Sequence, residues 1–359
     1  MATTDAAMLK ESVEIRNRLK NPERRFVYSK FSKNSFNKEF HYMNHDVKLM
    51  NFAQDLVGAK SDCYLLYAVA ALGVADLEGI RLFLNALHTK NKELSIPDMR
   101  QTSSVRHRLH ELAKGGMLFK MVYDVPKGEA EDSFDSTDDG TDNEVQDVNK
   151  VTLYTITNSS VALINKKLDR KLMVDEWIQA RPLFDLMGWS SCAYVAGRMA
   201  QNKNYVDQVQ GVYKTPAVGT VIIPGILKML AEDGEDVNYI GFFPGFLHID
   251  STITTDENFE KNCDYRLRYL SQYFFYQDKK KHLARAVVVV EDNSDLVQMA
   301  RRIHAFGAFK EDYDRIYFTG EGAVRKAKTS KLAHCFLRME EDNSEEGYSF
   351  KPVTPDFIH

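Results

Sequence analysis

Residues 103–114 read SSVRHRLHELAK, and this stretch decides the fold that the sequence predicts. Val105, Leu109 and Leu112 recur at the spacing of one helical face, so a helix here can rest on a hydrophobic core. The opposite face is polar and basic, and it carries His107, His110 and Lys114, with Arg106 and Arg108 on its flanks.

The segments on either side of this helix favour one domain class. Two helical segments precede it: residues 61–73 are nearly all apolar, and residues 77–88 can be capped by Asp76. Gly115-Gly116 ends the basic helix, and two strand-like runs follow it, near 117–125 and 151–157. Helix, helix, basic helix and β-hairpin is the order of a winged helix-turn-helix. We therefore expect such a domain over residues 61–170.

A basic helix in this position predicts contacts with DNA. Arg and Lys reach guanine edges in the major groove, and short polar side chains reach bases or phosphates. The alternative is a solvated amphipathic helix that a winged-helix fold uses for protein contacts. If the first interpretation holds, the contacts come from Ser103, Ser104, Arg106, His107, Arg108, His110, Lys114 and Lys120.

Two flanking segments differ sharply in charge. Residues 10–48 hold ten Lys and Arg against five Asp and Glu, whereas residues 126–150 hold two against nine. The acidic insertion lies at the hairpin tip, where phosphates would repel it, so it bends away, masks the DNA surface, binds a basic protein partner or is inert. Residues 1–60 form a basic leader, either an arm along DNA or a solvated segment whose aromatic residues dock on the first domain. The arm residues are Arg24, Arg25 and Lys30.

Composition bounds the class of protein. The chain has 359 residues, a net charge of −4 and 44% hydrophobic residues, which is ordinary for a globular protein of about two domains. No apolar run approaches the roughly 20 residues of a membrane helix. Its four cysteines lie far apart and form no CxxC, which favours reduced thiols in a cytoplasm and disfavours a structural zinc site. We expect neither a metal nor another cofactor.

From residue 171 the pattern changes to that of a second, α/β domain ending near residue 330. Residues 286–290 are a β-branched run typical of a buried parallel strand, and a helix and the strand 315–319 follow it. This β-α-β unit predicts a mixed, partly parallel sheet and gives an α+β fold overall. Pro224-Gly225 predicts a break before a short helix at 226–231. Residues 331–359 read as an acidic, partly disordered tail.

Catalysis has weaker support in the sequence. Glu291 follows the β-branched strand at the edge where open α/β sheets bind ligands, and with Asp250 or Asp256 it could form a carboxylate metal site. The alternative is that acids here favour the positive end of a helix dipole. The only Asp/Glu-x-Lys triplet of this domain, Asp278-Lys279-Lys280, lies at a helix end rather than on a strand. We therefore lean against an enzyme.

The layout of a winged helix over 61–168, then an α/β domain with the strand 287–290, a helix and the strand 316–319, resembles the replication-relaxation type proteins. Those proteins belong to plasmids and integrative or conjugative elements of Gram-positive bacteria. The resemblance implies a winged-helix DNA-binding domain joined to a nuclease-like α/β fold. The missing Glu-x-Lys departs from a working nuclease, so it implies an inactive scaffold.

The sequence thus predicts a cytoplasmic double-stranded-DNA-binding protein that regulates or assists replication, partition or conjugative transfer of a mobile element. Its α/β domain would serve homodimerisation or partner binding, with no role at a membrane. Two alternatives stay open: a metal-dependent nuclease or phosphotransfer enzyme, and a protein-interaction scaffold that binds no DNA.

Overall fold

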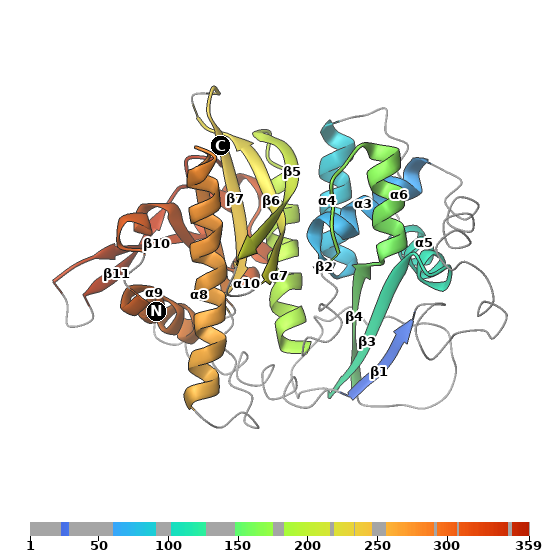
Figure 1. Cartoon of the computed structure of the whole chain (residues 1–359), viewed down its shortest axis with the longest axis horizontal. Helices are drawn as coiled ribbons and strands as arrows, with labels where there is room; N and C mark the ends of the chain where they lie inside the picture. The colour runs from blue at the N-terminus through green and yellow to red at the C-terminus, as the bar shows by residue number, and fades with distance from the viewer. Residues whose placement is uncertain are drawn as a thin grey trace.

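The computed structural model (Figure 1) describes eleven stretches of the chain, and every structural statement below refers to them. They are residues 23–28, 60–90, 102–126, 148–174, 183–215, 219–232, 234–245, 256–290, 293–306, 309–343 and 347–358.

The N-terminal half contains helices and a small antiparallel sheet, as the sequence predicts. Its sheet has the strand order β1-β3-β4-β2, and the long hairpin of β3 and β4 pairs from Leu118↔Ile156 to Pro126↔Val148. Its elements are β1 (Glu23–Tyr28), α3 (Lys60–Leu72), β2 (Val74–Ala75), α4 (Leu77–Lys90), α5 (Thr102–Lys114), β3 (Leu118–Pro126), β4 (Val148–Ile156) and α6 (Asn158–Leu168).

The C-terminal half is built on a seven-stranded mixed sheet of order β11-β10-β9-β8-β7-β6-β5. β7, β8 and β9 run parallel to one another, which confirms the β-α-β prediction, and the other neighbours are antiparallel. The elements are α7 (Leu183–Ala200), β5 (Tyr205–Thr215), β6 (Gly219–Leu230), β7 (Val237–Pro244), α8 (Asp256–Lys279), β8 (Leu283–Val290), α9 (Asn293–Phe306), η3 (Lys310–Arg315), β9 (Ile316–Gly320), α10 (Glu321–Lys326), η4 (Thr329–Cys335), β10 (Phe336–Glu341) and β11 (Tyr348–Val353).

The predicted helix at 226–231 is wrong, because β6 continues through Pro224-Gly225 to Leu230. The register with β5 shifts between Val209↔Ile226 and Gly211↔Ile223. This bulge accommodates Pro224, which has no N–H to donate to the ladder, and the left-handed backbone of Gly225 at φ +71°. Pro224-Gly225 therefore interrupts the regular pairing of β6 with a bulge, but it does not end the strand.

Much of the acidic stretch at 331–359 is ordered, which differs from the predicted loose tail. β10 pairs with both β9 and β11 and so completes the mixed sheet. Phe336, Met339 and Tyr348 are buried and tie these two strands to the core. The burial of these apolar side chains outweighs the acidic composition of the segment. Among the described residues, no helix is long and apolar enough to cross a membrane.

One hydrophobic core extends across the expected domain boundary near residue 170. α7 lies between α4 and the mixed sheet (Figure 1), and it crosses α4 where Gly197 faces the carbonyl of Gly79. Gln208 of β5 is buried and donates a 2.7 Å hydrogen bond to the carbonyl of Ala71 in α3. The two halves therefore share packing and buried hydrogen bonds, and α4 is held by elements of both.

A cluster of polar and charged side chains lies at the junction of the two halves, at the start of α4. Asp76 caps the helix by accepting from the N–H of Gly79 at 2.7 Å, and its own N–H donates to Ser190 of α7 at 3.2 Å. Arg325 of α10 lies 3.5 Å from the Asp76 carboxylate and also pairs with Glu78 and Glu321. The Arg325 guanidinium thus forms ion pairs with three carboxylates where α4, α7 and α10 meet.

The charge balance at this cluster makes stability depend on pH. Burial raises the pKa of Asp76 to about 6, with Glu321 and Glu78 adding to the rise and Gly79 and Arg325 opposing it. Because the folded pKa lies above the usual one, the contribution of Asp76 to stability is full below about pH 4 and is lost as pH rises through about 6. The Asp76 side chain keeps 31% of its exposure, so water screens the effect.

We predict that Asp76→Asn, which keeps the capping oxygen, removes this pH dependence. Urea unfolding of the wild type and the variant between about pH 4 and pH 7 should show the wild type losing stability relative to the variant as pH rises. A stability difference that moves in the wild type's favour with rising pH would show that Arg325 dominates over burial.

Candidate nucleic-acid interface

The predicted basic helix is α5, and its apolar stripe is the one that the sequence indicates. Val105, Leu109, Leu112 and Ala113 are buried, and all belong to the main core together with α3 and α4. Burial of each aliphatic side chain contributes about 1.5–3 kcal/mol, so the stripe fixes which face of the helix points outward.

The C-terminal end of α5 is locked by a Schellman motif. Met117 N–H donates to Leu112 C=O at 2.9 Å, and Gly116 N–H donates to Ala113 C=O at 2.9 Å. Gly116 has φ +79°, a left-handed conformation that suits glycine and that the sequence predicts here. The helix therefore ends sharply at Lys114, and β3 begins at Leu118.

Arg108 has a structural partner that reduces its availability to DNA. Its Nε donates to Asp62 Oδ1 at 2.7 Å and its Nη2 to Oδ2 at 2.5 Å, a bidentate pair across 46 residues of sequence. Asp62 lies in the first turn of α3 with only 5% of its side chain exposed, and its hydrogen bonds raise the pKa of Arg108. The pair anchors α5 to α3.

We predict that Asp62→Asn destabilises the protein by about 2 kcal/mol, because Arg108 then lies beside a neutral amide. A fully buried pair would lose about 3–5 kcal/mol, but 32% of the Arg108 side chain is exposed. Urea unfolding measures the loss. Glu111→Gln is the control, since it removes the surface pair with Lys114 at 3.4 Å and a minor attraction to Arg108 but leaves the Asp62 hydrogen bonds intact, and it should cost below about 0.5 kcal/mol. Equal effects of both variants would contradict the anchoring role.

The outward face of α5 presents the remaining predicted residues together. Ser103, His107 and Lys114 are exposed, while Ser104, Arg106 and His110 are half-buried along its sides. Lys114 shares the surface with Glu111, which moderates the positive charge at the end of the helix. This face is a polar, basic strip one helix long.

Three other predicted contacts lie away from that strip. Lys120 of β3 is buried at 9% exposure, between Tyr28 of β1 and Tyr154 of β4 in the sheet register. Arg24 and Arg25 lie in β1, which pairs with β3, so this part of the expected arm belongs to the sheet. Lys30 lies outside the described residues, as does most of the acidic insertion.

Of the three candidate carboxylates of the alternative enzyme, only Asp256 lies within the described residues. β7 and β8 are parallel and in register at Pro244↔Val289, so the chain after each leaves at the same edge. Asp250 and Glu291 lie outside the described residues, and Asp256 is the first residue of α8. Within the described ranges no three His, Cys, Asp or Glu side chains gather as metal ligands.

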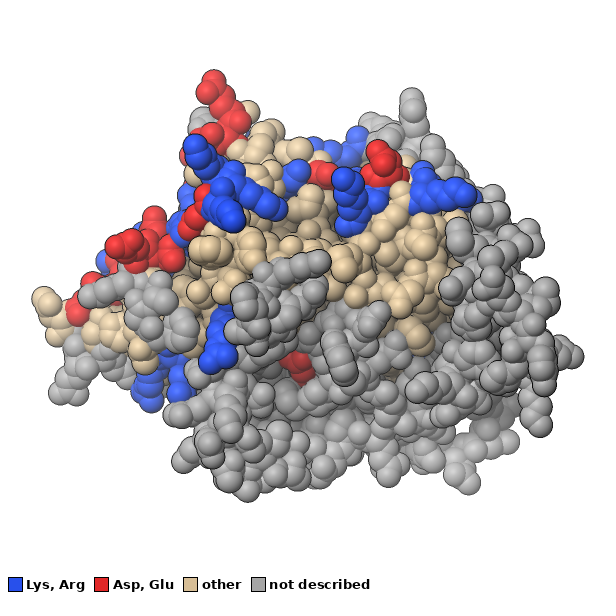
Figure 2. Space-filling model, in the orientation of Figure 1, with Lys and Arg blue, Asp and Glu red and all other residues tan. Residues whose placement is uncertain are grey.

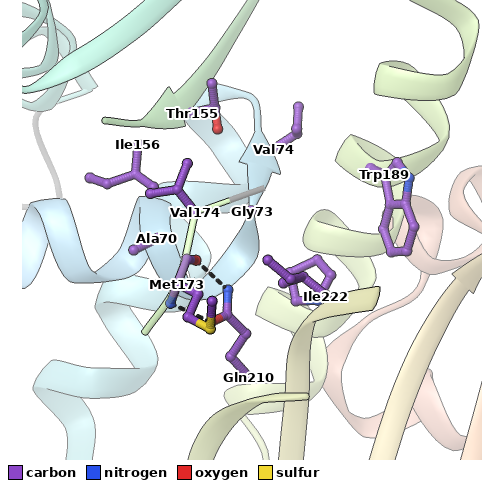
Figure 3. A pocket seen from close by; sticks show the side chains of 11 residues that line it. Ala70, Gly73, Val74, Thr155, Ile156, Met173, Val174, Trp189, Gln210 and Ile222 are labelled. Carbon is purple, nitrogen blue, oxygen red and sulfur yellow. Dashed lines mark hydrogen bonds between the residues drawn. The ribbon is translucent and has the colours of Figure 1, made fainter. Parts of the chain in front are cut away.

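A small pocket lies between the two halves, and it is too small for a metabolite. Figure 3 shows it between the β2–β4 side and residues of β5, β6 and α7, with Trp189 and Ile222 on its wall. Gln210 closes part of it by hydrogen-bonding the N–H and the carbonyl of Met173 at 2.7 and 2.8 Å. Its interior volume is about 20 Å³, which is room for one or two water molecules.

Comparison of the chain with profiles of known protein families, with curated proteins and with solved structures gives no match.

Proposed function

We propose that this protein binds double-stranded DNA and that α5 is the helix that enters the major groove. The observation that carries the proposal is the element order α3-β2-α4-α5-β3-β4, with α5 seated by its apolar stripe and its basic strip left outward. Helix-strand-helix-helix followed by a hairpin is the order of a winged helix-turn-helix.

The dimensions of α5 suit this role. Thirteen residues give a helix about 20 Å long and, with side chains, about 10–12 Å across, which matches a major groove about 12 Å wide. Arg106 and Lys114 are suited to phosphates or guanine edges, and Ser103 and His107 can donate to phosphate oxygens or base edges. Arg108 acts by holding the helix against α3.

The layout resemblance to replication-relaxation type proteins supports a narrower proposal. In it the protein works in the cytoplasm, in replication, partition or conjugative transfer of a mobile element, and the mixed sheet serves homodimerisation or partner binding. This narrower proposal rests on the order of the elements, and it stands only if the protein binds DNA through α5.

Salt-dependent binding of the full-length protein to a mixed-sequence duplex tests the proposal. Fluorescence anisotropy should give an affinity that falls linearly on a log–log plot with salt, with a slope of about −3 or steeper if roughly three or more phosphates are contacted. No binding to any duplex at about 50 mM salt, where phosphate contacts are strongest, would overturn the proposed function.

A further inference from the structure

A second cluster of cations lies at the far end of the mixed sheet, away from α5. Lys279 ends α8 and Lys280 and Lys281 follow it, and all three side chains are exposed. Lys228 reaches the same place from β6, because it pairs with Tyr239 of β7, which in turn pairs with Ala284 of β8. The end of α8 and strand β6, far apart in the chain, therefore bring their basic groups together.

Aromatic stacking holds part of this cluster in place. The rings of His282 and Tyr239 stack with centroids 3.8 Å apart and planes 3° apart, and Lys228 Nζ lies 5.4 Å from the Tyr239 centroid. Gln277 donates through Nε2 to the Tyr213 hydroxyl at 3.0 Å, so its Oε1 faces His282 Nδ1 at 2.7 Å. Because Gln277 Oε1 can only accept, this network places the proton of the neutral His282 imidazole on Nδ1.

The acids around the cluster do not neutralise it. Within the described ranges, no carboxylate forms an ion pair with Lys228, Lys279, Lys280 or Lys281. Asp278, the nearest acid in sequence, is held by Arg315 through contacts of 2.7 and 3.2 Å. Glu232, Glu235 and Asp236 follow Lys228 in the segment between β6 and β7. Figure 2 shows basic side chains gathered at the upper left, over the end of α8, with acidic ones at the turn above.

The local field is positive at its centre. The pKa of His282 is lowered, first by burial and then by the charges of Lys280 and Lys228, with no acid acting against them. The helix dipole stabilises lysines at a helix C-terminus, and this effect accounts for the positions of Lys279 and Lys280. It does not account for Lys228, which comes from a strand, or for the imidazole fixed beside it.

We propose that Lys228, Lys279, Lys280 and Lys281 form a second phosphate-binding surface, which takes the nucleic-acid backbone beyond the segment that α5 contacts. Figure 1 places α5 and the end of α8 in opposite halves of the molecule, so a duplex seated on α5 must extend past that helix to reach this surface. Lysine ammonium groups act as point charges toward phosphate oxygens, which suits sequence-independent contacts with the nucleic-acid backbone. The choice of nucleic acid as the polyanion that binds here rests on the proposed function.

Charge removal combined with duplex length tests this surface. The variant Lys228→Gln/Lys279→Gln/Lys280→Gln removes three charges while keeping polar side chains, and it should leave binding to a duplex of about 15 base pairs, one and a half turns, unchanged. On a duplex of about 45 base pairs it should lose about 10-fold in affinity and about 3 units of salt slope. The matched control is Lys326→Gln/Lys328→Gln/Lys331→Gln, which removes three exposed lysines elsewhere and should match the wild type on both duplexes.

The outcomes separate this surface from α5. Identical affinities of the wild type and the patch variant on the long duplex would overturn the second surface, as would an equal loss on the short duplex. If the wild type binds only the long duplex and the patch variant loses that binding, the surface stands and the α5 proposal fails. Polyglutamate of similar length is the competing probe; if it binds the wild type as tightly as the long duplex does, the assignment to nucleic acid is wrong.

Discussion

Reversing the charge of Arg106 and Lys114 together, as Arg106→Glu/Lys114→Glu, should weaken duplex binding at least about 100-fold at moderate salt. Each reversal removes an attraction to phosphate or guanine, worth about 1–3 kcal/mol, and adds a repulsion. The salt slope should become shallower by about 2 because two phosphate contacts are lost. Fluorescence anisotropy with the full-length protein over a range of salt measures both changes.

Two controls isolate the effect of position from that of net charge. Lys326→Glu/Lys331→Glu makes the same change in charge at two exposed sites of α10 and η4, and it should bind like the wild type. Urea unfolding checks that both double variants are folded, and the Lys326→Glu/Lys331→Glu protein should match the wild type within about 1 kcal/mol because both of its lysines are exposed. If both double variants weaken binding equally, the net charge of the protein and not the α5 strip governs the interaction.

Replacing Gly197 with leucine should destabilise the whole protein by about 3 kcal/mol or more, because it forces two packed helices apart. A Cβ at this position meets the Gly79 carbonyl at 3.1 Å, Leu82 Cβ at 3.1 Å and Phe83 N at 3.4 Å. Backbone atoms cannot yield as a flexible side chain can, so α4 must shift from α7. Because α4 also packs on α5, duplex binding should fall with the fold.

A graded series distinguishes this close approach from ordinary helix propensity. Gly197→Ala gains up to about 1 kcal/mol of helix propensity but meets the same contacts, so it should be near neutral or slightly destabilising. Gly322→Ala of α10 has no atom within 4 Å of its Cβ and should be neutral or stabilising. Thermal unfolding reports both, and a stable Gly197→Leu protein would contradict the tight junction of the two halves.

The elements nearest the predicted DNA-binding strip could be read from the sequence because local rules govern them. The three-residue apolar stripe of α5 and the Gly-Gly ending both follow from spacing and backbone preference within about 15 residues. Asp76 was also expected to cap α4, and it does. These features set the orientation of the helix and hence its outward face.

Contacts between distant residues could not be read in the same way. Nothing local indicates that Asp62 would engage Arg108 rather than cap its own helix, since the pair forms only when α3 and α5 pack. Lys120 was expected to face DNA, but β1 extends the sheet beyond β3, and the side chain is covered. The close approach of Gly79 and Gly197 likewise depends on a helix crossing between residues 118 positions apart.

The acidic composition of residues 331–359 predicts a partly disordered tail, but this segment contains strands β10 and β11. Residues 340–342 are acidic and lie between Met339 and Tyr348, both of which are buried. Glu340 and Glu341 lie in β10 itself, paired with Ser349 and Tyr348 of the edge strand β11. Glu340 forms ion pairs with Arg338 and Lys351, so the strand carries its charge on a compensated surface. The apolar residues of β10 and β11 were visible in the sequence, but they are sparse, and only pairing with β9 gives them a core to join.

Site-directed photocrosslinking tests the central claim that the outward face of α5 touches DNA. His107→Cys carries an azidophenacyl label in a Cys263→Ser/Cys335→Ser background, which leaves only the buried Cys63 and Cys192 beside it. Lys326→Cys in the same background is the matched position. The account predicts that illumination of the bound complex joins the duplex to position 107 and not to position 326. A complex that forms with normal affinity but crosslinks at neither position, or at position 326 alone, would contradict it.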